Sequence, residues 1–134
     1  MASIFSKIVA REIPAHILAE DENFLAFLDI NPLVDGHALV IPKKEVDYLF
    51  DHDDDTLAGV LVFAKGVARA IESVVECERI GVTVIGLEVP HAHVHLIPIN
   101  NVGDMNFEQM KLSPSPEELA EMASKIAKAY TALD

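Results

Sequence analysis

Three of the six histidines in the chain, His91, His93 and His95, alternate with apolar residues in a segment bounded by Pro90 and Pro98. Alternate side chains of a β-strand point to the same face of a sheet, and successive members of that face are about 7 Å apart. If this segment is a strand, the three imidazoles line one face, and the apolar residues between them face the core. Imidazole can act as a nucleophile, a proton carrier or a metal ligand near neutral pH, so this face could do chemistry.

Three interpretations of this face compete. The first is a solvated surface without function, which the strict alternation disfavours. The second is a metal site: histidines two residues apart can share a zinc ion, and His37 could reach it, although the strand itself holds no cysteine or carboxylate. The third is attack by a histidine on a phosphoryl group, with neighbouring imidazoles that hold protons. The residue pattern alone leaves the metal and the nucleophile interpretations open.

The segment His91–Ile97 is similar to the signature of the histidine triad family, in which three histidines alternate with apolar residues. Three further segments resemble motifs of the same family and occur in the family's order: Ser3–Pro14, Leu25–Pro32 and Gly36–Lys44. The resemblance extends from about Ile4 to Pro98 and does not include the C-terminal region. Together, the four segments are specific for this family.

The resemblance implies an enzyme that cleaves a nucleoside 5′-phosphate from a leaving group. The family's middle histidine attacks the α-phosphate, which assigns His93 as the nucleophile and implies a nucleotidyl-histidine intermediate. By the same resemblance, His95 contacts phosphate oxygens and assists proton transfer, while His91 and His37 complete the histidine network. The family's hydrolytic chemistry uses no catalytic metal, so we expect neither a metal nor another cofactor. An adenosine phosphoramidate is the first substrate expected, and a dinucleoside polyphosphate is the enzymatic alternative.

Asp29 matches the family residue that binds the ribose hydroxyls, and the implied small-molecule partner is a purine nucleotide. From the residues alone, Asp29 could instead cap the turn at Asn31 and Pro32. The positions that match the family's apolar base pocket, each of which is more typical of the core when taken singly, are Phe5, Ile8, Ile13, Phe27, Ile30 and Leu39. His16 and His52 match nothing in the family, and we predict that both lie on the surface.

The loop before the histidine strand departs from the family pattern. Family members usually carry Asn and Gln there as contacts to phosphate, whereas this chain has Thr83 and Leu87. Ile99 stands where many bacterial members have Arg. Donors to developing negative charge contribute strongly to such reactions, so their loss favours a nucleotide-binding module with little hydrolysis. The intact set of histidines opposes that alternative.

These residues must be positioned by strands and helices, and the predicted set of these elements indicates an α+β fold. We expect a five-stranded antiparallel sheet and two main helices. Alternating or β-branched apolar runs between turn signals predict strands at residues 15–20, 23–28, 37–41, 80–85 and 92–98. Asp53, Asp54 or Asp55 can cap a helix from Thr56 to about Val75. Ser115 and Glu118 form a capping box for a second helix that continues to near Ala132.

The first long helix is apolar on more than one face. Leu61 follows the helical period of the core-facing stripe, whereas Val62, Phe63 and Ala70 lie on other faces. A helix of this kind is usually covered on two sides, and in a chain this small a second subunit can supply the second cover. We therefore expect a homodimer, which the resemblance also implies.

The bulk composition bounds the remaining possibilities. The 134 residues show no repeat or linker, so residues 1–134 are expected to form one domain. The formal net charge of -12 argues against DNA or RNA as a partner. The chain has one cysteine, Cys77, no signal-peptide core and no apolar run long enough to span a membrane. These features predict a cytoplasmic protein without a membrane partner.

Overall fold

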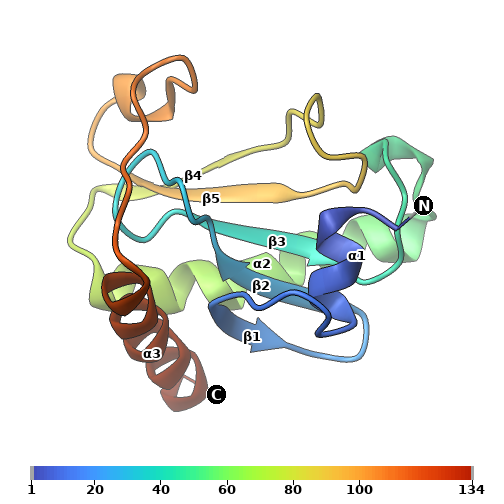
Figure 1. Cartoon of the computed structure of the whole chain (residues 1–134), viewed down its shortest axis with the longest axis horizontal. Coiled ribbons are helices and arrows are strands. Elements are labelled where there is room, and N and C mark those ends of the chain that lie inside the picture. Colours follow the sequence, from blue (N-terminus) through green and yellow to red (C-terminus); the bar gives the residue numbers. More distant parts are fainter. Residues whose placement is uncertain (1, 134) are drawn as a thin grey trace.

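The computed structural model describes residues 2–133 and contains one five-stranded sheet with helices on both faces (Figure 1). In chain order, the elements are α1 (Ile4–Val9), β1 (Ile17–Glu20), β2 (Phe24–Leu28), β3 (Ala38–Pro42), the 3-10 helix η1 (Leu49–Asp51), α2 (Asp54–Val74), β4 (Arg79–Thr83), β5 (Val94–Ile99), the 3-10 helix η2 (Val102–Met105) and α3 (Pro116–Ala132). In the described part of the chain, no helix is long and apolar enough to cross a membrane.

The strand order in the sheet is β1-β2-β3-β5-β4, and every neighbouring pair is antiparallel. The predicted α+β fold with a five-stranded antiparallel sheet is therefore confirmed. β3 and β5 are far apart in the sequence but pair in the sheet, with Leu39 opposite His95. This pairing brings the segment that precedes β3, which contains His37, to the histidine strand.

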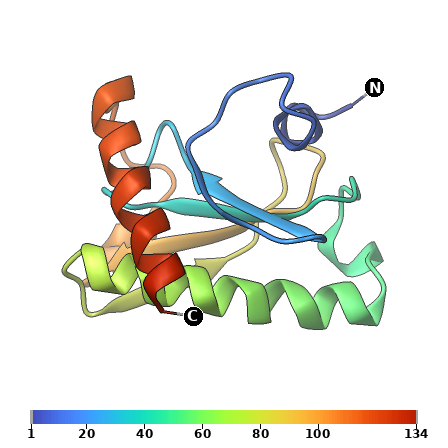
Figure 2. The ribbon, with the colours of Figure 1, turned by 90° about the horizontal axis from the view of Figure 1, so that it is seen from below.

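The alternation of side chains along the strands divides the core into two clusters. Val40 and Val94 belong to the larger cluster, which packs the sheet against α2 and α3. Leu39 and Ile41 belong to the smaller cluster on the other face, together with Phe5 of α1. Figure 2 shows α1 and α2 on opposite sides of the sheet. Because Leu39 lies opposite His95, the histidine site forms on the α1 face.

Both long helices begin with the caps that the sequence predicts. Asp53 accepts a hydrogen bond from the backbone N–H of Thr56 at 2.8 Å, and α2 begins at Asp54, two residues earlier than predicted. Ser115 and Glu118 form the predicted capping box of α3, with hydrogen bonds of 3.1 and 2.9 Å. Carboxylates near these helix starts also complement the positive end of the helix dipole.

The buried face of α2 differs in part from the prediction. Phe63 and Ala70, which were assigned to other faces, are buried in the larger cluster. Leu61, which was assigned to the core stripe, is 56% exposed, and Val62 is 73% exposed. The apolar surface beyond the core is therefore centred on Leu61 and Val62.

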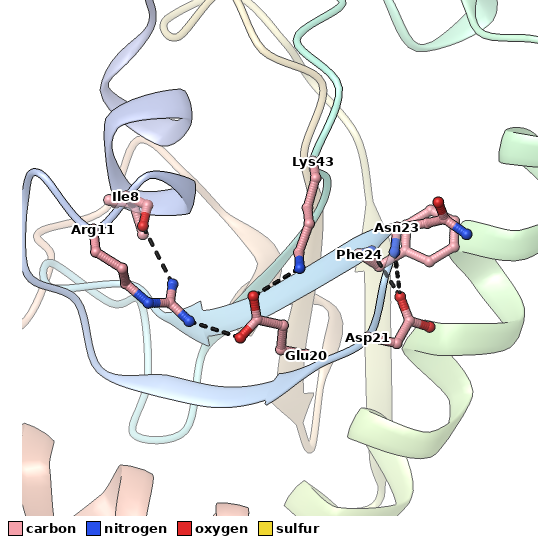
Figure 3. Close-up of polar contacts among 7 residues, drawn as sticks. All are labelled: Ile8, Arg11, Glu20, Asp21, Asn23, Phe24 and Lys43. Carbon is pink, nitrogen blue, oxygen red and sulfur yellow. Dashed lines mark hydrogen bonds and ion pairs between the residues drawn. The ribbon is translucent and has the colours of Figure 1, made fainter.

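α1 is a short helix that was not predicted from the sequence. Ser3 caps it by accepting a hydrogen bond from the backbone N–H of Ser6 at 3.0 Å. An ion-pair cluster connects the turn after this helix to the sheet (Figure 3). In that cluster, Oε1 of Glu20 lies 2.7 Å from a guanidinium nitrogen of Arg11, and Oε2 of Glu20 lies 2.7 Å from Nζ of Lys43. These contacts fix α1 over the smaller cluster.

β5 begins at Val94 rather than at Ala92, so His91 and His93 precede the strand. The backbone N–H of His91 donates to the carbonyl of Val89, and that of Ala92 donates to the carbonyl of Val46, which takes both groups out of the sheet ladder. The three imidazoles still face the same side. The rings of His93 and His95 have centroids 5.0 Å apart, and Phe5 contacts both His91 and His93.

Candidate active site

Four histidines gather on the α1 face of the sheet. His37, His91, His93 and His95 are each at most 7% exposed. Burial without a partner is costly for an imidazole, so the hydrogen bonds of each ring determine which nitrogen carries the hydrogen. The structure thus brings together all the histidines that were predicted as site residues.

His37 and His95 form a directed chain of hydrogen bonds. The backbone N–H of Leu33 donates to Nδ1 of His37 at 3.0 Å, so the ring hydrogen of neutral His37 is on Nε2. Nε2 of His37 lies 2.9 Å from Nδ1 of His95, to which it donates. His95 in turn carries its hydrogen on Nε2, which donates no hydrogen bond within residues 2–133.

Burial lowers the pKa of His37 to about 4, and the positive charge of Lys111 contributes to that shift. Burial also lowers the pKa of His95 to about 3, with further contributions from His37, His93 and Lys111. Desolvation disfavours the charged form of an imidazole. Both rings are therefore neutral at pH 7, which agrees with the hydrogen-bond chain.

The hydrogen of His93 is fixed on the opposite nitrogen. Nδ1 of His93 lies 2.8 Å from the carbonyl oxygen of His91, which can only accept. Nδ1 therefore carries the hydrogen in neutral His93, and Nε2 keeps a lone pair. The edge-to-face ring of Phe5, with its centroid 5.0 Å away, holds the imidazole from the α1 side.

His91 connects the site to α1. Its Nε2 donates to the carbonyl oxygen of Pro42 at 2.7 Å, so Nδ1 accepts from the hydroxyl of Ser3 at 3.0 Å. Glu45 accepts from the backbone N–H of Ser3 and from the hydroxyl of Ser6, both at 2.6 Å. These hydrogen bonds, that of the Ser6 hydroxyl above all, lower the pKa of Glu45 to about 2. Sequence reasoning did not find Ser3, Ser6 or Glu45.

Asp29 lies at the edge of the histidine group. Its Oδ1 accepts from the backbone N–H of Asn31 at 2.9 Å, so it does cap the turn. Its Oδ2 is 3.7 Å from Nε2 of His37. Burial raises the pKa of this carboxyl, and its hydrogen bond from Asn31 opposes that shift. A cleft lined in part by Pro32 and Glu118 opens at Asp29.

Most of the predicted base-pocket residues lie together beside the histidines. Phe5, Ile8, Phe27 and Leu39 are buried in the smaller cluster, and Ile13 packs at its edge, partly buried. Ile30 is not part of this cluster and is 61% exposed. The structure therefore gathers five of these six predicted positions around α1.

Two residues that the sequence did not point to lie beside His37 and His95. The ring centroid of Phe107 is 4.8 Å from that of His95 and 6.1 Å from that of His37. The charge of Lys111 acts on Asp29, His37 and His95. Both residues come from the irregular segment between η2 and α3.

The prediction for His52 was wrong. This residue, which directly follows η1, is 7% exposed, and its Nε2 has no hydrogen-bond partner within the described part of the chain. His16 is half-buried. Burial lowers the pKa of His52.

Asp29, His37 and His95 could be considered as a metal site, because one potential ligand atom from each lies within 4.8 Å of the other two. The hydrogen-bond chain disfavours that use. Nδ1 of His37 is occupied by the N–H of Leu33, and its Nε2 carries the ring hydrogen. A metal ion binds a nitrogen through a free lone pair. To bind one, Nε2 of His37 would have to lose its hydrogen while Nδ1 still accepts from Leu33, so the ring would carry no hydrogen on either nitrogen. The donor set therefore fits a proton chain better than a metal.

The loop before β5 carries the two departures from the family pattern. Thr83 ends β4 and lies opposite His95 in the sheet register. Leu87 is 88% exposed. Gly86, between them, has a φ of 75°, which a residue with a Cβ rarely adopts. The loop therefore carries an exposed apolar side chain, not an amide donor, four residues before His91.

The model of the HIT domain family matches residues 10–102 of the chain. An adenosine 5′-monophosphoramidase of Schizosaccharomyces pombe is 36% identical over 130 residues, which are 95% of this chain and 97% of that protein. A Hit-like protein of Bartonella henselae is 34% identical with a TM-score of 0.83, and the match covers 95% of both chains. A zinc-bound histidine triad family protein of Mycobacterium smegmatis is 31% identical with a TM-score of 0.84, over 100% of this chain and 96% of that chain. The chain belongs to the HIT domain family.

Proposed function

We propose that the chain is a nucleotide hydrolase or transferase that cleaves a nucleoside 5′-phosphate from its leaving group, with His93 as the nucleophile. The observation that carries this proposal is the hydrogen bond from Nδ1 of His93 to the carbonyl oxygen of His91, since it leaves a lone pair on Nε2. An imidazole held in this way is pre-organised to attack phosphorus. The phosphoramidase named among its relatives makes an adenosine phosphoramidate the first substrate to test.

The proposed reaction has two displacements at phosphorus. In the first, a bond forms between Nε2 of His93 and the α-phosphorus, and the bond from phosphorus to the leaving nitrogen breaks. The departing nitrogen keeps the electron pair and takes up one proton through His95. In the second, water attacks phosphorus, the bond to His93 breaks, and the proton lost by water replaces the one consumed. The net reaction adds one water across the P–N bond.

The neutral pair of His37 and His95 supports the role of His95. Because His37 donates to Nδ1 of His95, the remaining hydrogen of His95 is on Nε2 and is free to donate to a phosphate oxygen or to the leaving group. A cationic His95 would need to be formed against the burial that lowers its pKa. We therefore propose that His37 is an orienting residue for His95, and that His91 orients His93 through its carbonyl.

For the rest of the nucleotide, we propose that Asp29 binds the ribose hydroxyls and that the smaller cluster binds the base. Oδ1 of Asp29 is engaged with Asn31, which leaves Oδ2 as the acceptor for a hydroxyl. The predicted base-binding residues Phe5, Ile8, Ile13, Phe27 and Leu39 supply apolar surface next to His93. Ile30 would border the base from the exposed side.

The exposed Leu87 supports a leaving group with more apolar surface than a small amine. We propose that wild-type kcat/KM rises along a series of adenosine phosphoramidates as the apolar area of the amine grows. Leu87→Gln should flatten that rise without loss of stability, because the side chain is 88% exposed. A wild-type kcat/KM that is already flat, with Leu87→Gln faster on every member, would contradict this leaving-group assignment.

The test of the activity itself is a single-turnover experiment with adenosine phosphoramidate radiolabelled at phosphorus. Protein-bound label that forms before AMP is released, and that is absent in His93→Ala but present in His16→Ala, supports the covalent mechanism. A dinucleoside polyphosphate in the same experiment tests the alternative leaving group. Tight nucleotide binding with neither labelled protein nor product would instead indicate a binding module.

We also propose that the chain forms a homodimer. Leu61 and Val62 expose apolar surface on α2, and no other element of residues 2–133 covers them. β4 is an edge strand of the sheet, with Val82 53% exposed. A second copy related by a two-fold axis would cover this surface with the same surface.

A further inference from the structure

The segment from Phe107 to Leu112 lies along the Asp29 side of the histidine group. At its start, the Phe107 ring packs edge-on against His95, with centroids 4.8 Å apart. At its end, the backbone N–H of Leu112 donates to the carbonyl oxygen of Pro32 at 2.8 Å, three residues after Asp29. Two separate contacts thus hold this segment beside His95 and Asp29, and Lys111 lies between them in the sequence.

Lys111 is an exposed cation in a strongly acidic chain, which has 10 lysines and arginines against 22 aspartates and glutamates. Four of the other basic residues form ion pairs with carboxylates: Arg11, Lys43, Arg69 and Lys125. In residues 2–133, no carboxylate oxygen lies within 4.0 Å of the Lys111 ammonium group. Its charge instead acts on the neutral imidazoles of His37 and His95.

We propose that Lys111 binds a phosphate oxygen of the nucleotide and replaces the polar contacts that Thr83 and Leu87 do not provide. This inference rests on the proposed function, because it assumes that the phosphate lies at His93 and His95. The ammonium group contributes positive charge on the Asp29 side of the site, where it acts on Asp29, His37 and His95. A lysine acts on phosphate as a point charge, so it needs less exact placement than an amide.

The electrostatics of the free site agree with this role. After burial, the charge of Lys111 is the second contribution that lowers the pKa of His37. Burial raises the pKa of Asp29, and Lys111 is among the groups that oppose the rise. A cation that disfavours charged histidines and favours an ionised Asp29 supports both the neutral imidazoles and the ribose contact.

The test compares the binding of AMP and adenosine by calorimetry, in wild type, Lys111→Met and Lys111→Arg. We expect Lys111→Met to weaken AMP binding about tenfold or more and to leave adenosine binding unchanged, since only AMP carries the phosphate. Lys111→Arg should restore most of the AMP affinity. Lys128→Met is the control, because it removes the same charge from the exposed surface of α3. The AMP-specific loss should shrink as salt is raised.

Equal AMP affinity in wild type and Lys111→Met would overturn the inference. So would an equal loss for AMP and adenosine, which would mean that the segment supports the fold of the site rather than the phosphate. The inference would also be overturned if wild-type protein bound AMP no more tightly than adenosine. Because this readout needs no turnover, a failure of the labelling experiment with His93 would remove the hydrolytic function and still leave the binding result for Lys111 intact.

Discussion

Acidification from pH 7.5 to pH 5.0 should weaken the fold by about 4 kcal/mol through His37 and His95. Both imidazoles are buried, and burial lowers their pKa from 6.5 to about 4 and about 3. In the unfolded chain they titrate near 6.5 and take up protons in this range, whereas in the folded chain they do not. The stability is thus complete above pH 6.5 and is lost as the pH falls. Each group contributes about 2 kcal/mol at pH 5.0.

The other titrating groups determine the pH range in which this loss of stability can be measured. His91 and His52 have pKa values lowered by burial and act in the same direction. Glu45, with its pKa lowered to about 2, contributes stability that is lost only below about pH 4.5, outside the window. The net charge of -12 opposes the effect, because acidification relieves repulsion among carboxylates, so the experiment is run in 0.3 M salt.

Urea unfolding followed by circular dichroism at several pH values measures this loss. His95→Gln removes one titrating group but keeps an acceptor for His37, so its loss between pH 7.5 and 5.0 should be about 2 kcal/mol smaller than in wild type. His16→Gln is the control for the removal of an imidazole outside the site. A wild-type free energy of unfolding that changes by less than about 1 kcal/mol over this range would refute the assignment of neutral, buried imidazoles.

Four further outcomes are expected. His93→Ala should keep its circular dichroism spectrum and bind nucleotide but lose turnover, and a kcat above about a tenth of wild type would remove His93 as the nucleophile. Chelators should leave the rate unchanged, whereas stoichiometric zinc whose removal abolishes activity would restore the metal interpretation. Light scattering should give a mass near twice 14.6 kDa, and a particle of only one chain mass at micromolar concentration would reject the dimer. His52→Leu should raise stability by about 1 kcal/mol, because it removes a buried nitrogen without a partner, and a lower Tm would mean that this nitrogen is satisfied.

From the sequence, the sheet face on which the histidines lie was predicted better than the secondary structure around them. Alternation placed His91, His93 and His95 on one side, and this holds although β5 begins only at Val94. The same alternation correctly assigned Val94 and Leu96 to the main core. Patterns of period two depend on an extended backbone and not on sheet hydrogen bonds, so they survive where the ladder ends.

The partners of the histidines could not be predicted from local patterns. Ser3 is 88 residues from His91 in the sequence and 42 residues from Glu45, yet the three are joined by hydrogen bonds. Helix α1 has six residues, too few for a helical period to be visible. His52, between η1 and α2, is buried by tertiary packing, which the local sequence does not reveal. Phe107 and Lys111 lie in an irregular segment without periodicity.

The hydrogen bonds from Ser3 to Glu45 and His91 have a practical consequence for how the protein is produced. An affinity tag or fusion partner joined shortly before Ser3 would start close to these hydrogen bonds and therefore close to His91. The end of α3 lies far from α1 in both views of the ribbon (Figures 1 and 2). A cleavable C-terminal tag is therefore the safer choice, and kinetic constants obtained with N-terminal fusions should be compared with those of the released chain.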